Sequence, residues 1–306
     1  MATHDWIAPV AASRREDPSF GALSVESIKL DVADADALRR ALDGATGIVN
    51  CIAGPPSLIL ATAQALFAAA GEVSPRPRVI HIGSLAAYGS QTGIVDEESP
   101  LCGDLDEYSA AKAQCDRIAM QHDYVVSLRP GVVYGPGSPW WSDRIARLLI
   151  ARRLGDLGPH GEGICNLVYV DDVAAAVIAA LGLRDTSQRA FNLSSSAGLT
   201  WNEYFAKYAR ALSAPSIRTI SARRLGLETK VFSPPLKVLE LALRNPHLSR
   251  WNRLPPIRPW LPEICARKIQ MDASRAESML GMDWTPLDAG LAITADWFRS
   301  GGRTAI

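Results

Sequence analysis

The sequence predicts an α/β fold built on a parallel β-sheet. In the first half of the chain, short apolar runs alternate with stretches of helical periodicity, which is typical of repeated strand–helix–strand units. Apolar residues make up 48% of the 306 residues, enough for a substantial core. The longest apolar region, 48–70, is interrupted by Gly54, Pro55 and Pro56. We therefore interpret it as a strand, a turn and a helix, and not as a membrane span.

Strands and helices are expected in the following order. Strands are predicted at 6–12, 24–30, 48–52, 79–82, 124–128, 166–170 and 190–193. Helices are predicted at 35–42, 57–70, 105–122, 140–154 and 171–183, and the chain beyond Thr200 is mainly helical. We expect Asp34 to cap the helix at 35–42, and Asp171 or Asp172 to cap the helix at 171–183.

Charge and cysteine usage exclude several classes of protein. Lys plus Arg and Asp plus Glu both total 32, so no net field favours nucleic acid or an anionic membrane. The five cysteines are scattered and contain no CxxC pair, which favours reduced thiols over disulfides or a zinc site. The first ten residues lack the basic start and apolar stretch of a secretory signal. We therefore expect a cytoplasmic protein without a metal site.

The candidate catalytic residues are Ser84, Tyr108 and Lys112. Tyr108 and Lys112 are four residues apart in a predicted helix and so lie on one face. Ser84 follows the strand at 79–82, at the edge where open α/β sheets bind ligands. The pKa of a free tyrosine is about 10, and a nearby ammonium is expected to lower it. Tyr108 could then exchange a proton with an alcohol or carbonyl, with Ser84 bonded to the same oxygen.

A Tyr-x-x-x-Lys pair is common by chance, but four segments give this one a context. They are 79–89 (VIHIGSLAAYG), 108–112 (YSAAK), 128–137 (LRPGVVYGPG) and 168–174 (VYVDDVA). In order and spacing they resemble the extended short-chain dehydrogenase/reductase family, also called the NAD-dependent epimerase/dehydratase family. The resemblance runs from Trp6 to Leu193, and a weaker match covers 280–297. It implies a Rossmann-type, doubly wound parallel sheet with a smaller, mainly helical C-terminal part that binds the substrate.

The resemblance also assigns roles to individual positions. Ser84, Tyr108 and Lys112 take the catalytic roles, and Lys112 also holds the cofactor ribose. The other residues expected at the cofactor are Asp31 and Val32 beside the adenine, Ala53, Gly54 and Pro55 beside the adenosine ribose and pyrophosphate, and Pro130, Gly131, Val132 and Val133 along the nicotinamide.

Arg14 and Arg15 follow the strand whose end faces the adenine ribose. An arginine there can pair with a 2′-phosphate, which favours NADP over NAD, although both could be solvated turn residues.

Two structural parts are implied by the resemblance. Residues 1–135 and about 166–195 form the dinucleotide-binding core, and 136–165 and about 196–306 form the substrate-binding part. A homodimer could form through the helices at 57–70 and 105–122.

The first strand and glycine-rich turn of the family have no counterpart before Trp6. The segment Gly44-Ala-Thr-Gly47 follows a helix and is better interpreted as the loop before the strand at 48–52. We expect the first βα unit to be missing from this sequence, and the genomic reading frame to encode it upstream of Met1. An in-frame stop codon immediately upstream would contradict this. The less favoured alternative is a true truncation with impaired cofactor binding. Activity depends on this point, because that turn binds the pyrophosphate in the family.

Three functions remain open. Leu85, Ala86 and Ala87 stand where sugar 4,6-dehydratases of the family carry an acidic pair, which disfavours dehydration. The favoured function is an NAD(P)-dependent oxidoreductase that transfers hydride at a secondary alcohol or ketone, on a nucleotide sugar or a more lipophilic substrate. The alternatives are an NAD-retaining sugar 4-epimerase and, in another class, a non-catalytic dinucleotide-binding regulatory protein. The complete set of Ser84, Tyr108 and Lys112 favours an enzyme.

Other polar residues receive structural interpretations. His81, inside a strand, is expected to be packed in the core or at an edge, and His160 to be a solvated turn residue. The segment Asp96-Glu97-Glu98 is expected to be a solvated loop. Asp171 and Asp172 are interpreted as helix caps and not as metal ligands.

Overall fold

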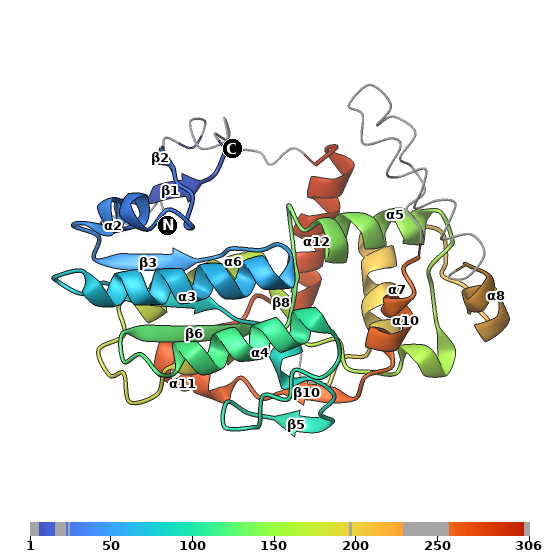
Figure 1. The fold of residues 1–306 in the computed structure, drawn as a ribbon. Coiled ribbons are helices and arrows are strands. Elements are labelled where there is room, and N and C mark those ends of the chain that lie inside the picture. Colours follow the sequence, from blue (N-terminus) through green and yellow to red (C-terminus); the bar gives the residue numbers. More distant parts are fainter. Residues whose placement is uncertain (1–5, 16–22, 24, 196–197, 229–256, 303–306) are drawn as a thin grey trace.

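The computed structural model describes residues 6–15, 23, 25–195, 198–228 and 257–302. It confirms the parallel α/β fold, joined to a smaller helical part (Figure 1). The strands are β1 (Val10–Ser13), β2 (Glu26–Lys29), β3 (Gly47–Asn50), β4 (Arg78–Ile82), β5 (Gly93–Val95), β6 (Val125–Pro130), β7 (Val132–Tyr134), β8 (Leu167–Tyr169), β9 (Ala190–Leu193) and β10 (Ile269–Met271). Ser24 and residues 229–256, which fall in predicted elements, lie outside the described residues.

The helices follow the predicted alternation in the first half of the chain. They are α2 (Ala35–Leu42), α3 (Pro56–Glu72), α4 (Glu107–Ala119), α5 (Arg144–Ile150), α6 (Val170–Leu181), α7 (Trp201–Ala211), α8 (Ala222–Leu227), α10 (Trp260–Cys265), α11 (Ser274–Leu280) and α12 (Leu287–Arg299). The short helical turns are η1 (Leu85–Tyr88), η2 (Pro139–Asp143) and η3 (Gly158–Gly161). The predicted helix at 140–154 is thus divided into a π-helical turn and α5.

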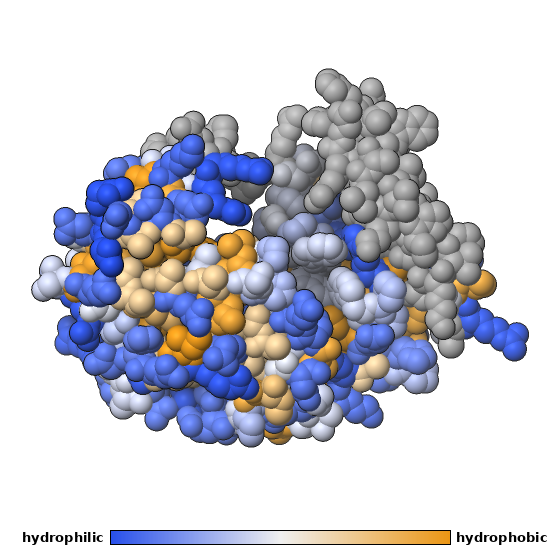
Figure 2. All heavy atoms as spheres, viewed as in Figure 1, coloured by the Kyte–Doolittle hydropathy of each residue, from blue (hydrophilic) through white to orange (hydrophobic). Residues whose placement is uncertain are grey.

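The described strands form four separate parallel sheets, where the sequence predicts one; two of the smaller ones are the pairs β5–β10 and β7–β8. β3, β4, β6 and β9 make a four-stranded sheet in that order, and β1 pairs only with β2. Among the described residues no strand lies between β1 and β3, so each has one unpaired edge. Helix α2 joins the smaller sheet to the body, because Leu38 and Leu42 share an apolar cluster with Leu66 of α3. Figure 2 shows an opening between this unit and the body.

The four-stranded sheet has a helical layer on each face. Val79 and Val125 face an apolar cluster with α3 and α4, whereas Ile80 and Val126 face a cluster with α6. This follows from the alternation of side chains along a strand. The second layer also includes α11, which packs against β9, although the sequence places this segment in the substrate-binding part.

The sequence predicts the residues that cap two helices, and the structure confirms one of the two predictions. Asp34 caps α2 as predicted, because its side chain accepts hydrogen bonds from the amides of Asp36 and Ala37. The prediction that Asp171 or Asp172 caps α6 is wrong. β8 runs directly into α6, so the cap position falls on Tyr169. Asp172 instead accepts hydrogen bonds from the Thr285 amide and hydroxyl.

The helical part has an aromatic core of its own. Trp201, Tyr204, Phe205 and Tyr208 line the buried face of α7 and pack among residues of α5, α10 and α12. A capping box starts α7, with the Thr200 and Glu203 side chains each bonded to the other's backbone amide. No helix in the described part of the chain combines the length and apolar character that crossing a bilayer requires.

Candidate functional site

The carboxyl edge of the four-stranded sheet brings together three groups of residues that the sequence selects. Neighbouring strands β3, β4 and β6 end there, and they are followed by 53–55, Ser84 and 131–133. Open α/β sheets bind ligands at this edge. Gly131 is required for local packing, because a Cβ atom there would lie 2.1 Å from the Asn166 carbonyl oxygen.

Ser84, Tyr108 and Lys112 converge at this edge. Lys112 is 6% exposed, and its ammonium donates a hydrogen bond of 2.8 Å to the Ile82 carbonyl at the end of β4. Ser84 caps η1 and accepts a hydrogen bond of 3.1 Å from the Ala86 amide. Its side chain also acts on the Tyr108 hydroxyl, whose pKa it lowers. The Tyr108 residue as a whole remains 40% exposed.

A capping box sets the position of the Tyr108 helix. The Asp106 side chain accepts a hydrogen bond of 2.7 Å from the Ser109 amide, and the Ser109 hydroxyl lies 3.0 Å from the Asp106 amide. This places Tyr108 in the first turn of α4, with Lys112 one turn further along.

The electrostatics of the pair differ from the sequence expectation. Burial raises the pKa of Tyr108, and the Ser84 side chain opposes this only in part. The expected lowering by Lys112 is wrong for this arrangement, because Nζ bonds the Ile82 carbonyl and lies 6.0 Å from the centroid of the Tyr108 ring. Burial also lowers the pKa of Lys112, against the attraction of Cys115, Asp116 and Cys51.

The residues expected at the adenosine end lie at the corresponding edge of the smaller sheet. Arg14 and Arg15 are exposed directly after β1, and Asp31 and Val32 follow β2. Because β1 and β2 pair in parallel, these positions lie side by side. These two strands belong to a different sheet from β4, the strand that precedes Ser84.

The start of α3 lies where the sequence predicts the pyrophosphate of a dinucleotide. Pro55 provides no side-chain cap, and Ala53 and Gly54 are exposed before it. The amides of the first helical turn therefore have no side-chain partner, and such amides bind anions.

Comparison with known proteins identifies the family. The model of the "NAD dependent epimerase/dehydratase family" matches residues 2–194. The chain belongs to this family. A curated relative, the 3-diazoavenalumate denitrifying reductase of a Streptomyces species, is 28% identical over 163 residues. That match covers 51% of this chain and 53% of the relative, so the chain spans about half the length of the curated relative it matches.

Solved structures share the family fold. A putative epimerase from Burkholderia cenocepacia superposes with a TM-score of 0.67 at 20% identity, covering 94% of this chain and 86% of that one. The UDP-glucuronic acid 4-epimerase of Bacillus cereus, solved with UDP-glucuronic acid and NAD, gives 0.67 at 17%, covering 95% and 90%. The UDP-glucose 4-epimerase of Thermotoga maritima, solved with UDP-glucose, gives 0.69 at 17%, covering 95% and 91%.

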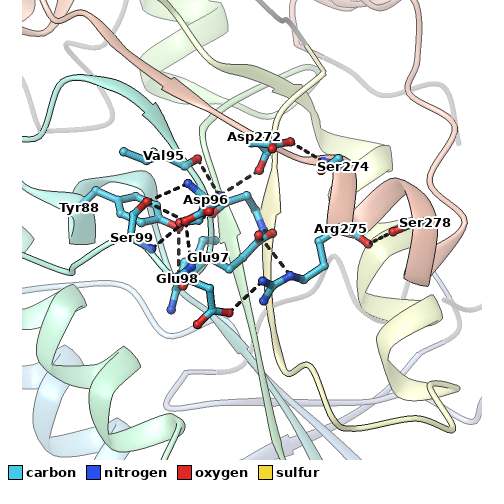
Figure 3. A network of polar contacts seen from close by, with 12 residues as sticks. Tyr88, Val95, Asp96, Glu97, Glu98, Ser99, Asp272, Ser274, Arg275 and Ser278 are labelled. Carbon is cyan, nitrogen blue, oxygen red and sulfur yellow. Dashed lines mark hydrogen bonds and ion pairs between the residues drawn. The ribbon is translucent and has the colours of Figure 1, made fainter.

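Within this family member, one loop differs from its sequence interpretation. The expectation that Asp96-Glu97-Glu98 is a solvated loop is wrong for Glu97, whose side chain is 3% exposed (Figure 3). Its carboxylate accepts a hydrogen bond of 2.7 Å from the Asn192 amide and pairs with Arg275. Glu98 remains exposed and also pairs with Arg275. Because Asn192 and Arg275 lie far from Glu97 in the sequence, no local pattern predicts that Glu97 is buried.

The two histidines differ in environment. His81 is in the core, 2% exposed, between Asn50 and the edge of Phe67, as the sequence suggests. His160 is exposed in η3. Within the described ranges, no group of three or more His, Cys, Asp or Glu side chains could hold a metal ion.

Sequence reasoning missed Asp116, which lies on α4 one turn after Lys112. Asp116 is completely buried, and it accepts a hydrogen bond of 2.6 Å from Arg129 Nε. Asp116 is four residues after Lys112, as Lys112 is four residues after Tyr108. The helical spacing therefore already places Asp116 on the same face of the helix as the other two.

Proposed function

We propose that this protein is an NAD(P)-dependent oxidoreductase that interconverts a secondary alcohol and its ketone. One observation supports the proposal: Ser84, Tyr108 and Lys112 meet at the carboxyl edge of the sheet, where Tyr108 is 40% exposed. A protein that only senses a dinucleotide has no need of this trio.

The protein side chains supply the proton chemistry. A bound NAD(P) supplies or accepts the hydride at the reacting carbon. Tyr108 donates a proton to the substrate oxygen during reduction and accepts it during oxidation. Because burial raises its pKa, the phenol is protonated at neutral pH, and this is the form that reduction uses. Ser84 orients the same oxygen, and Lys112 provides positive charge beneath the ring.

The decisive experiment replaces Tyr108 by Phe. We expect turnover to fall about 10²- to 10⁴-fold, the contribution typical of a general acid–base, while NADPH binding is retained. The measurement is NADPH oxidation on a substrate found by screening ketones and nucleotide sugars. Tyr124→Phe is the matched control, because that hydroxyl bonds the Phe67 carbonyl and takes no part in the site. Unchanged turnover in Tyr108→Phe would exclude the catalytic role. NADPH binding without turnover of any compound by the wild type would favour the regulatory alternative.

The cofactor we propose is NADP, with NAD as the alternative. The support is the pair of exposed arginines after β1, Arg14 and Arg15. The Bacillus cereus structure is described with NAD, which supports the dinucleotide class. We expect a larger thermal stabilisation by NADPH than by NADH, and the double variant Arg14→Ala, Arg15→Ala to lose the difference. Arg40→Ala, at another exposed arginine, serves as control. A larger shift with NADH would contradict the preference.

A 4-epimerase that retains NAD is the second candidate reaction, and the names of two structural neighbours support it. Such an enzyme converts a sugar without net oxidation of added NADPH, so product analysis in the same screen separates it from a reductase. Dehydration remains disfavoured, because η1 after Ser84 carries no acidic side chain.

The helical part supports a proposal for the substrate class. Trp140 is 45% exposed, with the Arg144 guanidinium 5.3 Å from its ring centroid and Trp260 edge-on at 6.1 Å. The exposed indole of Trp140, packed against the partly buried Trp260, supports a lipophilic substrate. The Streptomyces relative is named as a reductase, which supports the reaction class. A nucleotide sugar is the alternative. The homodimer through α3 and α4 and the cytoplasmic location stay predictions.

A further inference from the structure

Three buried polar atoms without a hydrogen-bond partner lie close to the base of the candidate site. They are His81 Nε2, Asp116 Oδ1 and Ser127 Oγ. All three residues are at most 2% exposed. Buried polar atoms in folded proteins almost always have a partner, so such a group calls for an explanation.

The three side chains share one face of the sheet. His81 on β4 and Ser127 on β6 are register partners, so their side chains point to the same side. Helix α4 covers this side and contributes Asp116, which bonds Arg129, two residues beyond Ser127 on the same strand. A Cβ atom on Gly83 would lie 3.2 Å from Ser127 Oγ. Gly83 directly follows Ile82, whose carbonyl holds Lys112, so the group lies next to the Lys112 site.

The chemistry of the three atoms is complementary. Asn50 Nδ2 lies 3.2 Å from His81 Nδ1. An amide nitrogen only donates, so Nδ1 accepts and the proton of the neutral ring is on Nε2. Burial favours this neutral form by lowering the pKa of His81 to about 4. The group therefore contains one N–H donor, one carboxylate acceptor and one hydroxyl that can do either. A single bound water molecule needs two to four such partners.

Lys112 needs a negative charge nearby to remain an ammonium in a buried position. The titratable groups that face it are Asp116 and Cys115 on α4, Cys51 after β3, His81 on β4 and Tyr108, whose ring centroid is 6.0 Å from Nζ. Burial raises the pKa of Tyr108, so the phenol is neutral. Burial raises the pKa of both thiols, which are therefore neutral, and His81 is neutral. Asp116 thus supplies the negative charge among these groups, and one of its oxygens is free of Arg129.

We propose that Asp116, braced by His81 and Ser127 through one bound water molecule, is the positioning residue that keeps Lys112 charged beneath Tyr108. The effect of this arrangement on turnover rests on the proposed function, but its effect on the pKa of Lys112 does not.

The test measures the ionisation of Lys112 directly. Protein labelled with ¹³C at the lysine ε-carbon is titrated by NMR, and Lys112→Met assigns the resonance. We expect Asp116→Asn to lower the pKa of Lys112 by roughly one unit or more, as loss of a close counter-charge does. Asp123→Asn removes an equal charge from an exposed side chain beyond the end of α4 and is expected to leave it unchanged.

Two milder variants keep the proposal falsifiable if Asp116→Asn does not fold. Ser127→Ala and His81→Gln weaken the brace without removing the charge, and we expect smaller shifts in the same direction. Asp116→Glu is expected to restore most of the wild-type value. A Lys112 pKa unchanged in every folded variant would overturn the proposal, as would a His81 ring protonated on Nδ1 in ¹⁵N spectra of the wild type. A lowered Lys112 pKa with undiminished turnover would uphold this inference and overturn the proposed role of Lys112 in catalysis.

Discussion

At the scale of single residues, His81 couples protonation to stability. Its pKa in the folded protein is lowered from 6.5 to about 4, chiefly by burial. The unfolded chain therefore binds one more proton than the folded protein between these pH values. His81 has no effect on stability above pH 6.5, and it destabilises the fold progressively as the pH falls towards 4. Over this whole pH range, the loss of unfolding free energy caused by His81 amounts to about 3 kcal/mol.

This sign gives a prediction for His81→Gln. Between pH 7 and pH 4.5 we expect the wild type to lose about 2 kcal/mol more of unfolding free energy than the variant, because the variant has no titratable side chain at position 81. Urea denaturation at both pH values measures the difference. His160→Gln, at an exposed histidine, should follow the wild type. Parallel losses in the wild type and His81→Gln would mean that His81 is protonated as easily in the folded protein as in the unfolded chain.

Individual site residues could be predicted from sequence when their signal was local. Tyr108 and Lys112 share a helical face and Ser84 follows a strand end, and the four segments that resemble the family give this spacing its meaning. The partners of the same site were missed, because strand register sets them. His81 and Ser127 become neighbours only when β4 pairs with β6. The direction of the Tyr108 pKa shift was missed for a related reason, since burial depends on the whole fold.

At the scale of elements, the loop between β5 and α4 is tied to the far end of the chain. The buried Glu97 carboxylate pairs with Arg275 of α11 at 3.4 Å, and the exposed Glu98 pairs with the same guanidinium at 2.9 Å (Figure 3). The Asn192 amide on β9 completes the link. Burial raises the pKa of Glu97, while its hydrogen bonds and Arg275 oppose that effect. Arg275 therefore matters more for the buried carboxylate than for the exposed one.

Replacing Arg275 by Met is the corresponding prediction. Removal of Arg275 leaves the buried carboxylate without its ion-pair partner and with Arg129 as the remaining nearby cation. We expect a loss of about 3 kcal/mol in unfolding free energy. Glu98→Gln breaks only the exposed pair and is expected to cost less than about 1 kcal/mol. The midpoints of urea denaturation at pH 7 measure both. Equal effects of the two variants would show that Glu97 does not depend on Arg275.

At the scale of the whole molecule, the order of strands and helices was predictable but their pairing into sheets was not. Alternating apolar runs locate β3, β4, β6 and β9 closely, because each strand is a buried segment between turns. Whether β1 lies beside β3 depends on contacts that no local pattern encodes. In the structure β1 and β2 form a four-residue pair, and α2 connects them to the body. Val10 of β1 is 50% exposed, as expected of an edge strand and not of a central one.

This division predicts two levels of local stability within one fold. A two-stranded sheet is marginal by itself, whereas β4 and β6 are paired on both sides and covered by helices. We therefore expect the amides of β1 and β2 to exchange with deuterium by local opening, and those of β4 and β6 only by global unfolding. Leu38→Ala, which weakens the attachment of α2, should speed exchange in β1 and β2 without affecting β6. Exchange–mass spectrometry at pH 7 resolves these segments. Equal protection of β1 and β6 in the wild type would mean that both sheets unfold as one cooperative unit despite their separation.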